Sequence, residues 1–182
     1  KHCDKVVLGE GENVIIDLIE NRFKNKIIQG SPVIDLDSYP MPDYNLVQGI
    51  KKNPSVVSVV TSRGCPYNCN FCSINSMFGR KYRVISVNRI IEYLSSFKNL
   101  KTLCFDEANF TADKQRAIEI LTQMKEHSIH PKRAWPSVSI DVAENDTLLK
   151  SFTEVSQFHF SIGLESINSK VLNAYNKKQT PE

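Results

Sequence analysis

Three cysteines that fall within eight residues are the part of the sequence best suited to chemistry. Cys65, Cys69 and Cys72 follow Arg63 and Gly64 with the spacing C-x3-C-x2-C. Thiolates are ligands for iron-sulfur clusters and for zinc. Three of them can hold three corners of a metal-sulfur cluster and leave the fourth metal open to another ligand. The spacing therefore predicts an enzyme that works through a metal centre.

Two other interpretations of the cysteines are possible. A structural zinc needs a fourth ligand, and the candidate histidines, His2 and His127, are not local to the loop. Cysteines at i, i+4 and i+7 could also be inert thiols on one face of a helix. Pro66, Asn68 and Asn70 disfavour a regular helix there. We therefore favour an iron-sulfur site over zinc or structural thiols.

Composition excludes several classes of function. The 182 residues carry a net charge of +3 with no run of five like charges, which gives no reason to expect nucleic-acid binding. No apolar stretch approaches the roughly 18 residues that cross a bilayer. The five cysteines are odd in number and three share one loop, so a disulfide framework is disfavoured and a reducing cytoplasm fits best.

The first 55 residues have a pattern of their own. The chain begins with Lys1 rather than Met, and we expect a segment of a longer protein. Residues 3–12 predict a short strand that ends at a turn. Residues 13–24 predict a helix with Val14, Leu18 and Ile19 on one face. Residues 29–55 contain four prolines and predict an extended connector that crosses the surface of the next domain.

From residue 56 onward, strand and helix patterns alternate. We expect strands over 56–60, 102–106, 135–141 and 157–163, and helices over 87–97, 113–127 and 146–154, with a last helix capped by Asn168. This alternation predicts parallel βα units with right-handed crossovers. Four units are too few to close a barrel, so we expect the native protein to continue past Glu182.

Polar residues follow each of the predicted strands. The cysteine loop follows the first strand, Asp106 and Glu107 follow the second, Asp141 ends the third, and Glu165 follows the fourth. Sites in parallel α/β folds gather at the carboxyl ends of the strands. The sequence therefore predicts a ligand site on this rim.

The same segments resemble a known family. Cys65-x3-Cys69-x2-Cys72, within TSRGCPYNCNFCS (61–73), resembles the signature of the radical S-adenosylmethionine (SAM) superfamily. GRKYRVIS (79–86), CFDEANFTAD (104–113) and IGLESINSKVLNAYNKK (162–178) are similar to its cobalamin-binding-domain subgroup. VVLGEGE (6–12) resembles the end of the upstream cobalamin-binding domain in that subgroup.

The resemblance implies an architecture. Residues 1–28 would be the tail of an upstream cobalamin-binding-like domain, and residues 29–55 a linker. Residues 56–182 would be the first four units of a partial (β/α)6 radical SAM barrel, a fold related to the TIM barrel.

The resemblance also implies cofactors. Cys65, Cys69 and Cys72 would ligate a [4Fe-4S] cluster whose open iron binds SAM. Reduction would then cleave SAM to a 5′-deoxyadenosyl radical, or SAM would also donate a methyl group through cobalamin held upstream. A reducing electron donor such as a flavodoxin or a ferredoxin is implied as a partner.

The family pattern assigns SAM contacts to five further residues. Asp106 and Glu107 stand where the family often has Gly-Gly-Glu, which binds the SAM amino group. Glu165 matches the position that contacts the ribose, and Lys177 the one that pairs with the SAM carboxylate. Asp141 lies near a polar SAM contact of relatives.

Each of these residues also has a plainer interpretation. Asp106 and Glu107 could begin a solvated loop. Glu165 could be a carboxylate favoured by a helix N-terminus, and Lys177 a solvated charge. The basic residues after the cysteine loop are either surface charge, contacts for an anionic substrate or packing over the cluster: Arg80, Lys81 and Arg83.

Two classes of function remain in consideration. The first is a radical SAM oxidoreductase or methyltransferase, active in the full-length protein and not in this segment alone. The second is a non-catalytic iron-sulfur or zinc redox module with no open coordination site. The identity of the substrate does not follow from the sequence.

Overall fold

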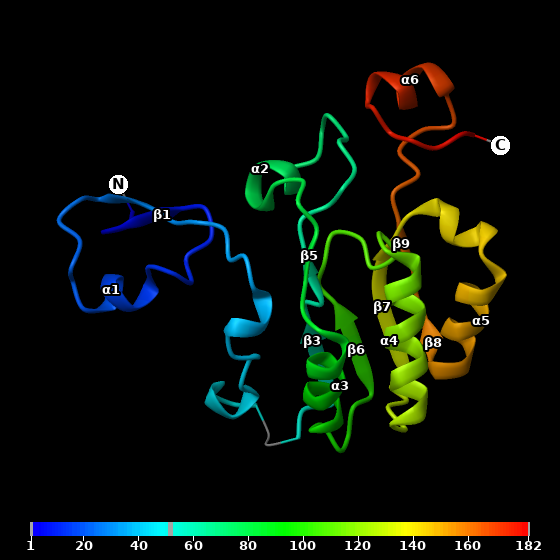
Figure 1. The fold of residues 1–182 in the computed structure, drawn as a ribbon, viewed down its shortest axis with the longest axis horizontal. Coiled ribbons are helices and arrows are strands. Elements are labelled where there is room, and N and C mark those ends of the chain that lie inside the picture. The colour runs from blue at the N-terminus through cyan, green and yellow to red at the C-terminus, as the bar shows by residue number, and fades with distance from the viewer. Residues whose placement is uncertain (1, 51–52, 182) are drawn as a thin grey trace.

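The computed structural model describes residues 2–50 and 53–181. Its centre is a parallel sheet in the order β3–β6–β7–β8, with β9 also pairing with β7 (Figure 1). The strands are β3 (Val56–Val59), β6 (Thr102–Phe105), β7 (Arg133–Val138), β8 (Gln157–Phe158) and β9 (Ser161–Ile162). All of these pairings are parallel. The predicted α/β class with a parallel sheet is confirmed.

Three helices connect the strands and cover one face of the sheet. They are α3 (Val87–Ser95), α4 (Lys114–Glu126) and α5 (Asp146–Val155), which pack in that order, whereas α6 (Ser169–Ala174) follows the last strand and lies beyond the strand ends (Figure 1). Side chains cap three of them, because Asp113, Asn145 and Asn168 each accept a backbone N–H from the first turn. Such caps satisfy donors that the helix leaves free.

The core lies between the sheet and these helices. On α4, Ala117, Ile120, Leu121 and Met124 are at most 1% exposed, as their i, i+3, i+4, i+7 spacing predicts. They belong to one hydrophobic core with strand residues such as Leu103. Burial of each large apolar side chain contributes about 1.5–3 kcal/mol, so this packing fixes the strand ends that carry the rim residues.

The N-terminal segment forms a small unit beside the sheet. Strand β1 (Val6–Leu8) pairs in parallel with β2 (Ile27–Gln29), and helix α1 (Ile15–Ile19) connects them. The predicted helix over 13–24 is too long, because the chain turns at Asn21, whose φ is 55°. Strand β2 was not predicted, since three residues carry too short a pattern.

The described part of the connector, residues 30–50 and 53–55, lies against the sheet domain. It contains two 3-10 turns, η1 (Leu36–Ser38) and η2 (Tyr44–Leu46). The Tyr44 hydroxyl accepts the backbone N–H of Ser58 at 2.8 Å, and Leu36 is buried in the core. The connector is therefore packed against the sheet domain.

Two predicted strands end differently in the structure. The expected strand over 135–141 ends at Val138, and residues Ile140–Glu144 form the 3-10 helix η3, so Asp141 lies on η3 rather than at a strand end. The strand expected over 157–163 is interrupted between Phe158 and Ser161.

Three short elements near the cysteines were not predicted. Strands β4 (Ser62–Arg63) and β5 (Arg83–Val84) pair antiparallel, and helix α2 (Ile74–Phe78) lies between them in the chain. The two strands form a neck at the base of the segment that carries the cysteines. In the residues that the structure describes, no helix combines the length and the apolar character required to cross a membrane.

Candidate functional site

The three cysteines lie on a loop, residues 65–72, that leaves β4 through Gly64. No helix forms there, as Pro66 and the asparagines predict. Gly64 has a φ of +83°, and a Cβ on it would lie 2.3 Å from the backbone oxygen of Lys81. Only glycine meets both conditions. All three thiols are free and half-buried, so the loop presents them with little cover.

The end of α6 holds this cysteine loop from the other side. Asn70 donates through its backbone N–H to Tyr175 O and through Nδ2 to Ala174 O, both at 2.9 Å. Asn176 Nδ2 donates to Asn68 O at 2.7 Å. The rings of Phe71 and Tyr175 meet edge to face at 5.2 Å. Residues more than one hundred positions apart thus fix the loop.

A cavity of about 440 Å³ opens between the cysteine loop and the rim of the sheet. The predicted site residues that line it are Cys65, Cys72, Asp141, Glu165 and Lys177. The carboxyl ends of β7 and β9 supply its floor. The structure therefore brings together side chains from four separate parts of the sequence.

The charged residues of this cavity pair with one another. Lys177 Nζ lies 3.5 Å from Glu165 Oε1, and Lys114 Nζ lies 2.8 Å from Asp141 Oδ2. Asp141 Oδ1 is buried without a hydrogen-bond partner. Glu165 has a φ of 59°, a conformation that is strained for a residue with a side chain. A ligand that carries hydrogen-bond donors and acceptors could contact these charged side chains in place of their present partners.

The thiols influence one another electrostatically. Burial raises the pKa of the Cys65 thiol above its ordinary value, and charges on Cys72 and Cys69 raise it further. The Lys177 ammonium and the backbone N–H of Tyr67 act in the opposite direction. A bound metal cation would instead lower the pKa of the Cys65 thiol, because metal coordination deprotonates thiols.

The described residues contain no group of three or more His, Cys, Asp or Glu side chains arranged to hold a single metal ion. The zinc interpretation needs a compact set of four ligands.

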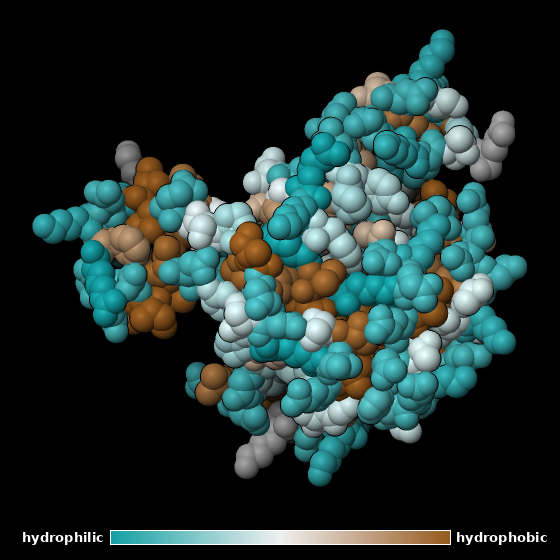
Figure 2. Space-filling model, in the orientation of Figure 1, coloured by the Kyte–Doolittle hydropathy of each residue, from teal (hydrophilic) through white to brown (hydrophobic). Residues whose placement is uncertain are grey.

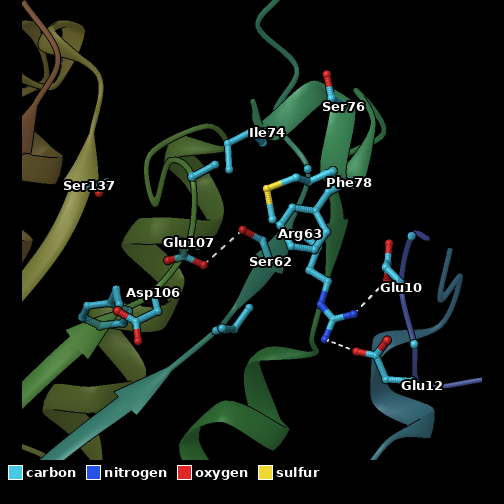
Figure 3. A pocket seen from close by; sticks show the side chains of 17 residues that line it. Glu10, Glu12, Ser62, Arg63, Ile74, Ser76, Phe78, Asp106, Glu107 and Ser137 are labelled. Atoms are coloured by element: carbon cyan, nitrogen blue, oxygen red, sulfur yellow. Dashed lines mark hydrogen bonds and ion pairs between the residues drawn. The ribbon is translucent and has the colours of Figure 1, made fainter. Parts of the chain in front are cut away.

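Asp106 and Glu107 line a second, neighbouring cavity of about 900 Å³ (Figure 3). The two cavities share Ala108 and Ser137. Thus the structure does not gather all five predicted contacts into one cavity. The reason is local: Glu107 turns toward β4, where its Oε2 accepts from the backbone N–H of Thr61 at 3.1 Å, from the Thr61 hydroxyl and from the Ser62 hydroxyl.

Glu107 is not the solvated loop residue that one interpretation allowed. It is only 9% exposed, and burial raises its pKa, although the hydrogen bonds from Thr61 and Ser62 oppose the change. Its second oxygen, Oε1, is buried without a partner. Asp106, by contrast, is exposed. Glu107 thus has an acceptor, or a proton to donate, at the wall of the larger cavity.

An ion-pair group that sequence reasoning missed joins the N-terminal segment to the cysteine loop. Glu10 is buried and contacts Arg83. Glu10 and Glu12 both contact Arg63 (Figure 3). Burial alone would raise the pKa of Glu10, but hydrogen bonds from Arg83, Arg63 and the backbone N–H of Val33 outweigh it and lower the pKa. The sequence shows two glutamates in one turn and an arginine on either side of the cysteines, but nothing local to these residues indicates that they pair.

Comparison with known proteins gives consistent matches. Residues 59–182 match the family described as the radical SAM superfamily. An uncharacterized methyltransferase of Pyrococcus horikoshii is 31% identical over 98% of this chain and 44% of its own length. The bacteriochlorophyllide d C-8(2)-methyltransferase of Chlorobaculum tepidum is 28% identical over 97% of this chain and 42% of its own. The chain thus spans less than half the length of these relatives.

A solved structure shares the fold. The apo form of OxsB, described as a cobalamin-dependent S-adenosylmethionine radical enzyme, superposes with a TM-score of 0.71 at 21% identity. The match covers 94% of this chain and 29% of that chain. At this identity the match supports the architecture, including the N-terminal segment, and not the ligands.

Proposed function

The chain belongs to the radical SAM superfamily, and from that premise we propose that it is the cluster- and SAM-binding part of a methyltransferase. The observation that carries the proposal is the cavity of about 440 Å³ in which Cys65 and Cys72 meet the charged residues Glu165 and Lys177. Methyl transfer is favoured because both relatives compared above are described as methyltransferases, and an oxidoreductase is the alternative because a further relative, 27% identical over 97% of this chain, is described as an anaerobic magnesium-protoporphyrin IX monomethyl ester cyclase.

The residues present suit a [4Fe-4S] cluster held by three thiolates. Cys65, Cys69 and Cys72 would bind three irons. The other two cysteines, Cys3 and Cys104, lie outside this segment of the sequence. When bound, the cluster supplies the electron for reductive cleavage of SAM. The chain's own part is to hold the thiolates, and Asn70 and Asn176 do this through the end of α6.

The charged lining suits the methionyl and ribose parts of SAM. Lys177 would pair with the SAM carboxylate, and Glu165 would accept hydrogen bonds from the ribose hydroxyls. Asp141 would contribute its unpartnered Oδ1. Asp106 and Glu107 border this cavity through Ala108, so their contact with the SAM amino group requires SAM to reach the shared wall.

We further propose that residues 1–28 end an upstream cobalamin-binding-like domain, with 29–55 as the linker and 56–182 as the first part of the barrel. A parallel pair of three-residue strands is too small to be stable alone. Apolar surface is visible among hydrophilic residues on this segment (Figure 2), and its exposed large apolar side chains are Leu8, Ile15, Ile16, Ile19 and Ile27. Such a patch suits burial against the rest of a domain.

The free thiols suit a reducing compartment, so we propose a cytoplasmic protein that receives electrons from a donor such as a flavodoxin or a ferredoxin. The exposed position of Phe71 in the cysteine loop leaves that side of the site open to a partner.

The test uses the full-length protein, reconstituted anaerobically with iron and sulfide. The reduced protein should give a cluster spectrum that changes on addition of SAM, and turnover should release 5′-deoxyadenosine or S-adenosylhomocysteine. Cys65→Ala should lose the iron, whereas Cys104→Ala, a control on β6 outside the loop, should keep it. The proposal would be refuted if the cluster spectrum did not change on addition of SAM and no SAM-derived product formed. Bound zinc would favour the non-catalytic module.

A further inference from the structure

The neck of the cysteine segment pairs two like charges. In the β4–β5 ribbon, Arg63 lies directly opposite Arg83, and Ser62 lies opposite Val84. Like charges that face each other across two strands are destabilising. The ribbon has only these two residue pairs, so its own backbone bonds offer little to offset the repulsion.

The turn at Gly9–Glu12 supplies the opposite charges. Glu10 bridges both arginines, with Oε1 at 2.5 Å from Arg83 Nη2 and Oε2 at 2.8 Å from Arg63 Nη1. Glu12 Oε1 lies 2.5 Å from Arg63 Nη2. The side chains of Glu10 and Arg83 are only 4% and 3% exposed. A buried charge of this kind is costly without its partner.

The backbone around Glu10 is built for this contact. Gly9 has a φ of +92°, and a Cβ on Gly30 would lie 2.1 Å from the Glu10 carbonyl oxygen. Both positions therefore need glycine. The backbone N–H of Val33 also donates to Glu10 Oε2 at 3.2 Å. Strands β1 and β2 thus hold the carboxylate in place.

Arg83 extends the contact to the cysteine segment itself. Besides Glu10, it donates to Val33 O at 2.5 Å and to Phe78 O, at the end of α2, at 3.2 Å. On the other strand, only Gly64 separates Arg63 from Cys65, and Gly64 packs against the backbone of Lys81. A shift of either arginine would therefore move the chain next to the first thiol.

We propose that Glu10 and Glu12 are positioning residues for the three cysteines. By neutralising Arg63 and Arg83 at the neck, the N-terminal turn fixes the geometry in which the thiols are presented. The inference rests on the proposed function only for the identity of the group that the thiols bind. On this proposal the N-terminal segment supports the metal site, although the segment contributes no ligand.

The experiment compares full-length wild-type protein with Glu10→Gln, Glu12→Gln and Glu154→Gln. Glu154 forms an exposed ion pair with Lys125 on the far helices, so its variant is a matched control for the loss of one carboxylate. In reconstituted protein, Glu10→Gln should release iron to a chelator at least about tenfold faster, since the buried Arg83 loses the carboxylate that neutralises it. Glu12→Gln should have a smaller effect and Glu154→Gln none.

Hydrogen exchange of the iron-free proteins provides a second measurement. Glu10→Gln should raise exchange within residues 64–82 while α4 keeps its protection. Unchanged exchange in 64–82 and an unchanged iron release rate would overturn the proposal, as would an equal gain in every element. If wild-type protein binds no iron, the proposed function fails, and the exchange data still decide the role of Glu10. If Glu10→Gln does not fold, Glu12→Gln carries the same comparison.

Discussion

Gly163 lies against the carboxylate of Glu165, so closely that a Cβ on it would stand 2.5 Å from Glu165 Oε1 and 2.9 Å from Lys177 Nζ. Both atoms are the free ends of flexible side chains, and they can move aside. The glycine therefore keeps space for two charges that line the cavity of the cysteine loop.

From this contact we predict that Gly163→Ala weakens SAM binding with little loss of stability. The added methyl group displaces Glu165 and Lys177 from their ion pair and changes the positions from which they would meet SAM. Calorimetric titration of the anaerobic full-length protein should show an affinity about tenfold lower, which is about 1.4 kcal/mol.

Gly64→Ala is the contrasting control for that measurement. Its Cβ would meet a backbone oxygen at 2.3 Å, and its φ of +83° disfavours any side chain. This variant should lose stability as well as iron. Equal stability losses in the two alanine variants would contradict our account of Gly163.

Glu107 should make stability fall as the pH rises. Burial raises its pKa, so the folded protein keeps a proton that the unfolded chain loses at about pH 4.3. The free energy of unfolding therefore begins to fall near the ordinary glutamate pKa, and it falls further until the pH passes the raised pKa of the folded protein. Glu107→Gln cannot ionise and should gain stability relative to wild type from about pH 4 upward, until the pH passes the raised pKa of Glu107.

Urea unfolding of both proteins across this pH range measures the difference. Glu154→Gln should give the opposite sign, because the hydrogen bond and charge of Lys125 lower the pKa of Glu154. Ionised Glu154 stabilises the folded wild-type protein above the ordinary glutamate pKa, and this stabilisation is lost as the pH falls below it. A stability difference for Glu107→Gln that does not change with pH would show that Glu107 ionises freely in the folded state.

Asn70→Ala should loosen the cysteine loop and leave the sheet domain intact. The side chain of Asn70 donates to Ala174 O, while its backbone bond to Tyr175 O remains in the variant. The loss of one hydrogen bond costs about 0.5–1.5 kcal/mol. Iron retention should fall several-fold at an unchanged melting temperature. The control variant Asn25→Ala, on the N-terminal segment, should change neither the iron retention nor the melting temperature.

Phe152→Ala should destabilise the whole domain. The ring is 2% exposed and lies within 6.0 Å of the rings of Phe110, Phe158 and Phe160. Truncation of a buried phenylalanine costs about 3–5 kcal/mol. The urea midpoint should drop sharply with the slope unchanged. A loss below about 1 kcal/mol would mean that the aromatic group repacks around the gap.

The sequence predicted the sheet domain well because its periodic patterns are long. Helix α4 follows its apolar spacing over thirteen residues, and Asn145 and Asn168 cap the helices expected of them. The ends of the strands and of α6 then placed Cys65, Glu165 and Lys177 around one cavity. These features depend on local pattern and on the geometry of parallel strands.

The parts that were not predicted depend on contacts between distant residues. Strands β4 and β5 have two residues each, too few for a pattern. The basic residue Arg83 looked like surface charge or a substrate contact, but its partner Glu10 lies 73 positions away. Asp141 fell on η3 because the strand ended three residues early. No local signal marks any of these outcomes.

The anchor of the cysteine loop also sets an order in time. Asn70 is tied to Ala174, which is 104 positions later in the chain. A ribosome adds about 5–20 residues per second, so the thiols are synthesised roughly 5–20 s before their anchor. During that interval the nascent chain carries three unanchored thiols. Under the proposed function, the thiols would reach their anchored geometry only after α6 has been made, and a chain that stops before residue 174 would lack this anchor.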